Sequence, residues 1–259
     1  MKKILLALTA VAAMTGSASA ADLAARPYVK APMAAPVANW TGFYVFGGGG
    51  GLSNADQHVQ TTGTNTALTI DQRQGGSGWF GTVGLGYDWQ FNSTWVAGVF
   101  ADGQFGSIRA TIQDPVGGIT GSQKLEDSWA AGVRLGWLVA PNVLSYVNGG
   151  YSGAHFGSTN FTNVFGTPAG IHLNSYNRNG WFVGGGVENS LNIFGISSPG
   201  WFMKTEYRSA FYNAKTSNEL FDGTNTLVGR DIRANSWNQT ISTSLVYRFN
   251  WTGPVVAKY

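Results

Sequence analysis

The stretch WNQTISTSLVYRF, from Trp237 to Phe249, alternates in character at every second position. Its odd-numbered positions are mostly apolar or aromatic, and its even-numbered positions are mostly Asn, Ser and Thr. A period of two indicates a β-strand with one apolar face and one polar face. The stretch has 13 residues, whereas strands of soluble proteins usually have about 5–6.

The length of this strand matches the thickness of the apolar part of an outer membrane. Trp237 and Tyr247 lie ten residues apart on the apolar face, which is roughly 33 Å along a strand. At a tilt of about 40° the strand rises roughly 25 Å, the height of the apolar band between the aromatic girdles of an outer-membrane barrel. The stretch therefore predicts a transmembrane β-strand.

The N-terminal part of the chain predicts export. Residues 1–20 have the pattern of a secretory signal peptide: basic Lys2 and Lys3, a short apolar run, and a small-residue cleavage site at Ala18-Ser19-Ala20. The apolar run is too short to span a bilayer as a helix. Residues 21–39, with three prolines among Ala and Val, are expected to form an extended Pro/Ala-rich periplasmic leader.

The charge balance excludes several classes of protein. The chain has 16 Lys and Arg against 13 Asp and Glu. Without Lys2 and Lys3 the basic count falls by two to 14, so no electrostatic argument favours nucleic-acid binding. Only 11% of residues are charged, against about 25% in an ordinary globular domain. There is no Cys, which excludes disulfides and Cys-ligated zinc.

Hydropathy excludes one of the two ways to cross a membrane. After the signal peptide no run of 18 apolar residues occurs, so a transmembrane helix is not expected. A chain that crosses the bilayer without helices must form a closed barrel, because only then are all backbone groups paired.

Eight segments are predicted to be strands. They are residues 40–52, 78–91, 94–107, 123–140, 143–157, 179–190, 200–212 and 235–249. Long polar segments at 53–77, 108–122, 161–174 and 213–234 alternate with short connections at Asn92-Ser93, Pro141-Asn142 and Ser197-Ser198-Pro199. In the fourth strand we expect Leu125 to face outward, with Lys124 and Glu126 facing the interior. Long extracellular loops, short periplasmic turns and an even strand count are typical of outer-membrane barrels.

The aromatic residues support this arrangement. Trp79, Trp129, Trp181 and Trp237 lie at strand ends next to long loops, and the other six Trp lie beside short turns or chain ends. Trp prefers the membrane interface because its ring is amphipathic. The predicted membrane-interface girdle consists of Trp79, Trp89, Trp95, Trp129, Trp137, Trp181, Trp201, Trp237, Tyr247 and Phe249.

The predicted fold is therefore all-β: an eight-stranded antiparallel up-and-down transmembrane β-barrel over residues 40–250, with a C-terminal periplasmic tail at 251–259. A soluble secreted β-sandwich also alternates, but it would need shorter strands and would bury its Trp residues at mid-strand. The expected location is the cell outer membrane.

The chain resembles a known family. The Pro/Ala-rich leader, the start Trp40-Thr41-Gly42-Phe43-Tyr44 and the end Val246-Tyr247-Arg248-Phe249 are similar to small outer-membrane β-barrel proteins of alphaproteobacteria, the porin-family or opacity-like immunogenic proteins. The resemblance implies a barrel at the cell surface with roles in envelope integrity and contact with a host or surroundings. The partners to expect are outer-membrane lipid and lipopolysaccharide, the barrel-assembly machinery, and host or environmental ligands at the loops.

The polar face of the strands is expected to line the lumen. It carries Asp102, Arg134, Glu188, Lys204, Glu206, Arg208 and Arg248. An eight-stranded barrel is about wide enough to be filled by side chains, and an unpaired buried charge costs several kcal/mol. We therefore predict a structural ion-pair cluster, with a narrow gated pathway for water and ions as the alternative.

No enzymatic site is predicted. Lipid-modifying barrels of this size need a Ser with an oriented His. His58 and His172 lie in predicted loops, and His155 and Ser152 are three residues apart and so face opposite sides of a strand. No metal-ligand spacing occurs, so neither metal nor cofactor is expected.

Two functions remain. The first is a structural envelope and cell-surface interaction role through four long extracellular loops. The alternative is a small-solute diffusion porin, and an outer-membrane lipid-modifying enzyme is a remote third possibility.

Overall fold

The computed structural model describes residues 39–64, 66–193 and 196–249. The predicted signal peptide (1–20), the predicted leader (21–39) apart from Asn39, and the predicted tail (251–259) lie outside the described residues. No helix among the described residues is long and apolar enough to cross a membrane.

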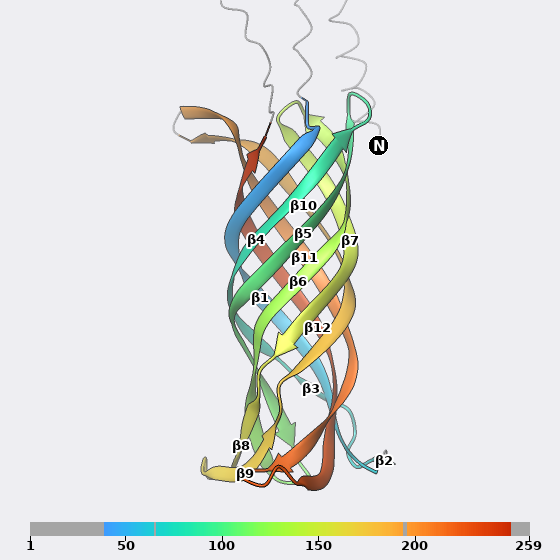
Figure 1. Ribbon diagram of the computed structural model, residues 1–259, viewed down its shortest axis with the longest axis vertical. Coiled ribbons are helices and arrows are strands. Elements are labelled where there is room, and N and C mark those ends of the chain that lie inside the picture. The colour runs from blue at the N-terminus through green and yellow to red at the C-terminus, as the bar shows by residue number, and fades with distance from the viewer. Residues whose placement is uncertain (1–38, 65, 194–195, 250–259) are drawn as a thin grey trace, which may run out of the picture. The chain divides into compact units, whose positions relative to one another are not determined.

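Eight long strands form one closed antiparallel ring (Figure 1). They are β1 (Gly42–Gly63), β4 (Gly76–Gln90), β5 (Trp95–Asp114), β6 (Ile119–Ala140), β7 (Val143–Phe156), β10 (Tyr176–Ile193), β11 (Ile196–Phe221) and β12 (Leu227–Arg248). Each strand pairs with the next in this order, and β12 pairs with β1. The predicted eight-stranded, antiparallel up-and-down architecture is confirmed.

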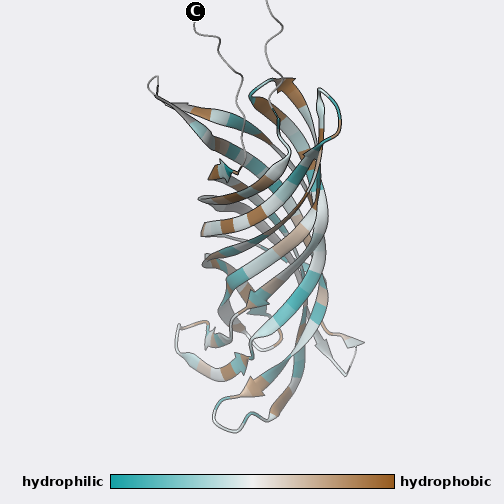
Figure 2. Ribbon diagram, turned by 45° about the horizontal axis from the view of Figure 1, so that its top comes forward, coloured by the Kyte–Doolittle hydropathy of each residue, from teal (hydrophilic) through white to brown (hydrophobic). Residues whose placement is uncertain are grey.

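The alternation seen in the sequence becomes an inside and an outside. In β12, Val246 and Arg248 are buried in the lumen, whereas Ile241 and Leu245 are exposed on the outer face. Hydrophilic and hydrophobic residues accordingly alternate along the ribbons in Figure 2. The outer face is apolar, as in other outer-membrane barrels, and the lumen holds both polar and apolar side chains.

The four segments predicted to be long loops are mostly strand, and that prediction is wrong in detail. Strands β1, β5, β11 and β12 continue through them, so that β5 and β6 are joined by the short turn at 115–118. Short strands account for much of the rest: β2 (Thr66–Ala67), β3 (Gln72–Gln74), β8 (Thr159–Asn163) and β9 (Pro168–Leu173). Polar composition had indicated loops, but polar residues in strands outside the membrane face water on the outer surface and need not interrupt a ladder.

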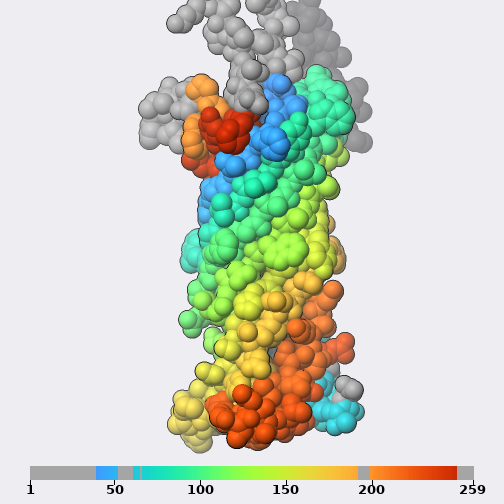
Figure 3. Space-filling model, viewed as in Figure 1, coloured from blue at the N-terminus to red at the C-terminus, as the bar shows by residue number. Residues whose placement is uncertain are grey.

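The β8–β9 hairpin completes the ring at this extended end of the barrel. The hairpin takes the place of β7 and β10 in the ring, because both of these strands end before they reach this level. Strand β8 pairs with β6 at Gly121↔Phe161, and β9 pairs with β11 at Glu219↔Leu173. Figure 3 shows the hairpin, in yellow, beside the end of β11, in orange. The opposite end carries the short turns at 91–94 and 141–142.

The extended end has a hydrophobic core of its own. It is a buried cluster of Ile112, Ile119, Phe161, Ile171, Leu173, Ile232 and Ala234. Water surrounds this part of the barrel if the aromatic rows mark the membrane, so its inward apolar side chains gain the usual stabilisation of burial. The cluster fills the ring at this end.

A β-bulge reverses the predicted facing of one segment. The register of β6 against β7 shifts between Leu125 and Asp127. Beyond the bulge Leu125 is buried, while Lys124 and Glu126 are on the outer surface. Strict alternation counted back from Trp129 had predicted the opposite facing. The extra residue of the bulge moves each side chain on its far side, including Leu125, to the other face of the sheet.

The glycine run in β1 serves close strand packing. A Cβ at Gly48 would collide with the β12 backbone at Thr243 and Ser244. At Gly47, by contrast, the nearest such atom would be the Thr82 carbonyl oxygen, 3.9 Å away. Glycine is therefore required at position 48 for a steric reason.

We predict that Gly48→Ala destabilises the barrel by about 1–3 kcal/mol through overpacking at the closing seam. Gly47→Ala is the matched control and should be close to neutral. The temperature at which the folded band converts to the unfolded band on gels measures both. Equal conversion temperatures for the two variants would refute this reading of the seam.

Candidate functional site

The structure brings the seven polar-face residues together inside the lumen. All are at most 6% exposed: Asp102, Arg134, Glu188, Lys204, Glu206, Arg208 and Arg248. They come from β5, β6, β10, β11 and β12. Their side chains form two adjoining networks, which together we call the lumen belt.

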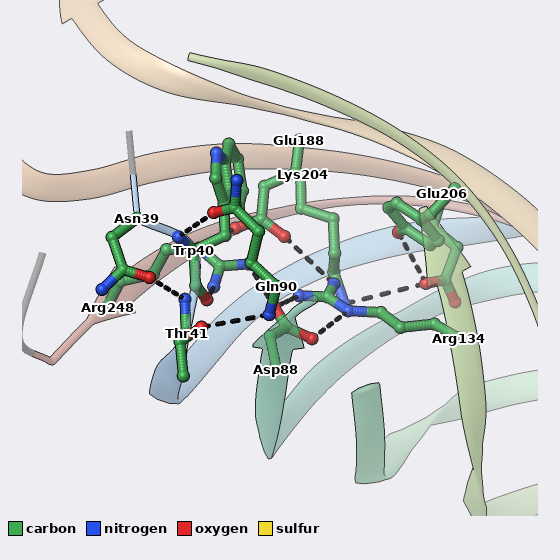
Figure 4. Close-up of polar contacts among 11 residues, drawn as sticks. Asn39, Trp40, Thr41, Asp88, Gln90, Arg134, Glu188, Lys204, Glu206 and Arg248 are labelled. Atoms are coloured by element: carbon green, nitrogen blue, oxygen red, sulfur yellow. Dashed lines mark hydrogen bonds and ion pairs between the residues drawn. The ribbon is translucent and has the colours of Figure 1, made fainter. Parts of the chain in front are cut away.

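The first network alternates two cations with two anions (Figure 4). Arg134 donates from Nε to Asp88 Oδ1 at 2.8 Å and from Nη1 to Glu188 Oε2 at 3.1 Å. Arg248 donates from Nε to Glu188 Oε1 at 2.7 Å, and its Nη2 lies 2.8 Å from Asp88 Oδ2. Each carboxylate thus bridges both guanidinium groups, which compensates the cost of removing four charges from water.

The second network lies further toward the extended end. Arg208 holds Asp102 in a two-pronged contact, at 3.0 Å from Nη1 and 2.7 Å from Nη2. It also donates from Nη2 to Glu206 Oε1 at 2.7 Å. The other oxygen of Glu206 accepts from the Tyr146 hydroxyl at 2.8 Å and lies 3.8 Å from Lys204 Nζ.

Aromatic rings cover the cations of the belt. The Arg134 guanidinium lies 4.4 Å from the centre of the Tyr44 ring, and Lys204 Nζ lies 3.3 Å from that of Phe46. The Arg208 guanidinium lies 4.6 Å from the Phe182 ring. These cation–π contacts, like the ion pairs, leave the charges little freedom to move and strengthen in a dry interior.

Asp88 is the member that the predicted cluster omitted. It is fully buried and contacts both Arg134 and Arg248. The signal was present, because Asp88 lies on the polar face of β4 beside Trp89 and Tyr87. Strand alternation places it in the lumen, but only the three-dimensional ring shows that two arginines reach it from β6 and β12.

Trp40, which is not among the residues of the predicted girdle, closes the short-turn end of the lumen. It is 1% exposed. Its backbone N–H donates to Gln90 Oε1 at 2.8 Å (Figure 4). Its indole N–H donates to the carbonyl of Pro141 at 3.3 Å. Its ring lies 4.4 Å from the Arg248 guanidinium. The predicted first strand begins at residue 40, whereas β1 begins at Gly42 and leaves Trp40 just before it.

The eight Trp residues of the predicted girdle lie on the outer surface, between 37% and 81% exposed. Trp181, Phe211 and Trp237 stack in sequence, with ring centres 4.4 and 5.0 Å apart. At the short-turn end Trp95 stacks on Trp137, and Trp201 packs against Tyr247. Their role at the membrane interface stays a prediction.

The lumen contains a small cavity beside the belt. A cavity of about 20 Å³ lies between the second network and the extended end, lined by residues that include Ser152, Arg208, Tyr212 and Asn238. That volume suits one or two water molecules. The belt can therefore hold the barrel together but leaves no open path at this level.

His155 and His172 contact polar side chains other than serine. His155 Nδ1 lies 2.6 Å from Asn177 Oδ1, and His172 Nδ1 lies 2.6 Å from Asp222 Oδ1. Both His58 and His172 had been predicted in loops but lie in strands β1 and β9. Neither His155 nor His172 has a serine hydroxyl among its described hydrogen bonds.

The extended end carries a separate buried acidic pair. Asp114 accepts hydrogen bonds from Thr61 Oγ1 at 2.9 Å, from the backbone of the 115–118 turn, and from Arg230 Nε at 2.8 Å. Glu219 is also fully buried, and its nearest cation is Arg230 Nη2 at 3.3 Å. Burial, reinforced by the negative charge of Asp114, raises the pKa of Glu219 to about 7.

We predict that Arg134→Leu destabilises the barrel by about 3–5 kcal/mol, because it leaves the buried carboxylates of Asp88 and Glu188 with Arg248 as their remaining arginine partner. Arg233→Leu removes an exposed cation from β12 and should change stability by less than about 0.5 kcal/mol. Both are measured as unfolding temperatures in detergent. An unchanged unfolding temperature for Arg134→Leu would mean that the ion pairs contribute nothing.

We predict that Glu219 makes stability depend on pH. A raised pKa means that the native state holds a proton which the unfolded state releases, so this contribution is full below about pH 4.5 and is lost as pH rises through about 7. Glu219→Gln should therefore match the parent near pH 4.5 and unfold at a higher temperature than the parent at pH 8. Glu126→Gln, at an exposed position, is the control. A Glu219→Gln difference that is constant across this range would contradict the assignment.

Comparison with known proteins agrees with the geometry. The family model described as outer membrane protein beta-barrel domain matches residues 4–249. The 31 kDa outer-membrane immunogenic proteins of Brucella melitensis and Brucella suis are each 26% identical over 259 residues, covering 96% of this chain and 100% of theirs. The solved outer membrane protein OprG of Pseudomonas aeruginosa shares the fold, with a TM-score of 0.50 at 10% identity over 82% of this chain and 98% of its own.

The predicted resemblance to small outer-membrane barrels is thereby confirmed, and so is the predicted location. The family match covers nearly the whole chain, including every strand of the ring. This protein belongs to the outer membrane beta-barrel domain family and resides in the cell outer membrane.

Proposed function

We propose that this protein is a closed, non-enzymatic barrel that supports the outer membrane and presents an ordered β-structured surface outside the cell. The observation that carries the proposal is the filled lumen. The four cations and four anions of the belt are mutually paired, and Trp40 covers the short-turn end. A diffusion porin needs a continuous water-filled path, which this packing opposes.

The extended end supports a surface role. Strand β12 begins at Leu227, ten residues before Trp237, so it rises roughly 25 Å beyond the aromatic row at the same tilt. Its partners continue alongside, and the hydrophobic cluster holds them together. A surface built in this way is stiffer than free loops, because its backbone groups are already paired.

The tips of the extension offer apolar contact area. Val164 and Phe165, in the β8–β9 turn, are 80% and 88% exposed. Exposed apolar side chains at a loop tip are costly in water and are common at contact surfaces. Host or environmental ligands would meet these tips first. Lipid and lipopolysaccharide would contact the outer face of the barrel, and the barrel-assembly machinery would insert it.

The experiment is a planar-bilayer recording on the refolded protein, with an epitope inserted at Gly166 to report orientation and folding. We expect no conductance steps from the parent, and antibody access to the epitope on intact cells. A matched epitope at Asn92, in the β4–β5 turn, should be accessible only after permeabilisation. Reproducible steps that change with Arg134→Leu would instead establish the porin alternative.

A further inference from the structure

Among the residues whose side chains the structure describes, one buried cation lies outside the belt. Arg178, in β10, is 3% exposed. The belt itself is balanced, with Arg134, Lys204, Arg208 and Arg248 against Asp88, Asp102, Glu188 and Glu206. Arg178 forms no ion pair with any described residue. The interior therefore holds one positive charge without a counter-charge at this position.

The contacts of Arg178 leave part of its guanidinium unused. Nη2 donates to the Tyr176 hydroxyl at 2.8 Å. The Phe156 and Tyr176 rings each lie 4.9 Å from the guanidinium carbon and contribute cation–π attraction. Nε and Nη1 are buried and have no hydrogen-bond partner. A buried donor without a partner costs about 1–3 kcal/mol, and more when it is charged.

The neighbouring polar groups do not supply the missing acceptor. Gln123, 1% exposed, donates from Nε2 to the same Tyr176 hydroxyl at 2.6 Å. Its Oε1 has no partner. Turning the amide round would let Oε1 accept the Tyr176 proton, but it would leave the amide N–H groups unpaired instead. Donors exceed acceptors around Tyr176 in either orientation.

We propose that Arg178, with Tyr176 and Gln123, forms a binding site for a small monovalent anion such as chloride. The proposal requires local side-chain adjustment, since the free guanidinium atoms are covered by protein atoms. A halide is spherical and accepts several N–H and O–H bonds at once, and its single charge balances the single guanidinium. Water could accept a hydrogen bond but would not balance the charge.

The position of the site suits an anion from outside the cell. Arg178 lies three residues beyond Trp181 toward the extended end, and so beyond the aromatic row. The site does not depend on whether the barrel conducts, so it stands or fails separately from the proposed function. Multivalent oxyanions are larger and carry excess charge, which a buried single guanidinium cannot balance.

The first test compares unfolding temperatures of the refolded protein in sodium chloride and in sodium gluconate at equal ionic strength. Gluconate is too large for a buried site, so chloride should raise the unfolding temperature by a few degrees and the rise should saturate. Arg178→Met keeps the long unbranched stem and removes the charge, and it should lose the chloride response. Arg233→Met, which removes an exposed charge, should keep it.

The second test needs no variant and remains decisive if Arg178→Met does not fold. Crystals of the parent protein in sodium bromide should show an anomalous peak within about 3.5 Å of Arg178 Nε or Nη1, the range expected of an N–H···halide contact slightly longer than N–H···O. The proposal is overturned if no such peak occurs. It is also overturned if chloride and gluconate give the same unfolding temperature, or if Arg178→Met retains the full chloride response.

Discussion

A backbone amide that faces hydrocarbon has no water to bond, and the whole structure follows from that constraint. Eight strands satisfy it only if the last pairs with the first, and here β12 pairs with β1 from Tyr44↔Arg248 to Thr62↔Asp231. The seam is packed tightly enough that Gly48 and Gly50 have no room for a Cβ against the β12 backbone. The glycine run, which carries no phosphate-binding motif, is thus part of the closure.

A ring of eight strands encloses a narrow lumen, and charged side chains in a narrow lumen must be paired with opposite charges. Side chains from strands that are not neighbours meet there, so Arg134 of β6 reaches Asp88 of β4 and Glu188 of β10. In a space with room for little water, an ion that lacked its partner would be strongly destabilising. The belt is therefore better understood as a set of ion pairs that join non-adjacent strands than as a pore lining. Arg178 is the buried cation of the described residues that has no carboxylate to balance its charge.

Beyond the aromatic row, where we predict that the same strands enter water, the structure has a second source of stability. The extended end has the hydrophobic cluster around Phe161 and Ile232, and Asp114 joins β1, the 115–118 turn and β12 through its hydrogen bonds. Only three residue pairs, Glu219↔Leu173 to Phe221↔Ile171, join β9 to β11. Glu219 lies in this short pairing, so its protonation affects the stability of the part of the barrel that the proposed function places outside the cell.

The sequence by itself determined the number of long strands, their antiparallel order and which side chains face inward along most of their length. It could do so because a strand has a fixed period of two and a membrane demands long apolar faces. The same local rule failed where a tertiary cause intervened: at the bulge beside Leu125 and in the polar segments that proved to be strand. Only the closed ring decided which charges meet, that Asp88 belongs to the belt, and that Arg178 lacks a counter-charge. The contacts of the first network, for example, join residues at least 46 positions apart, across a lumen whose width depends on all eight strands at once.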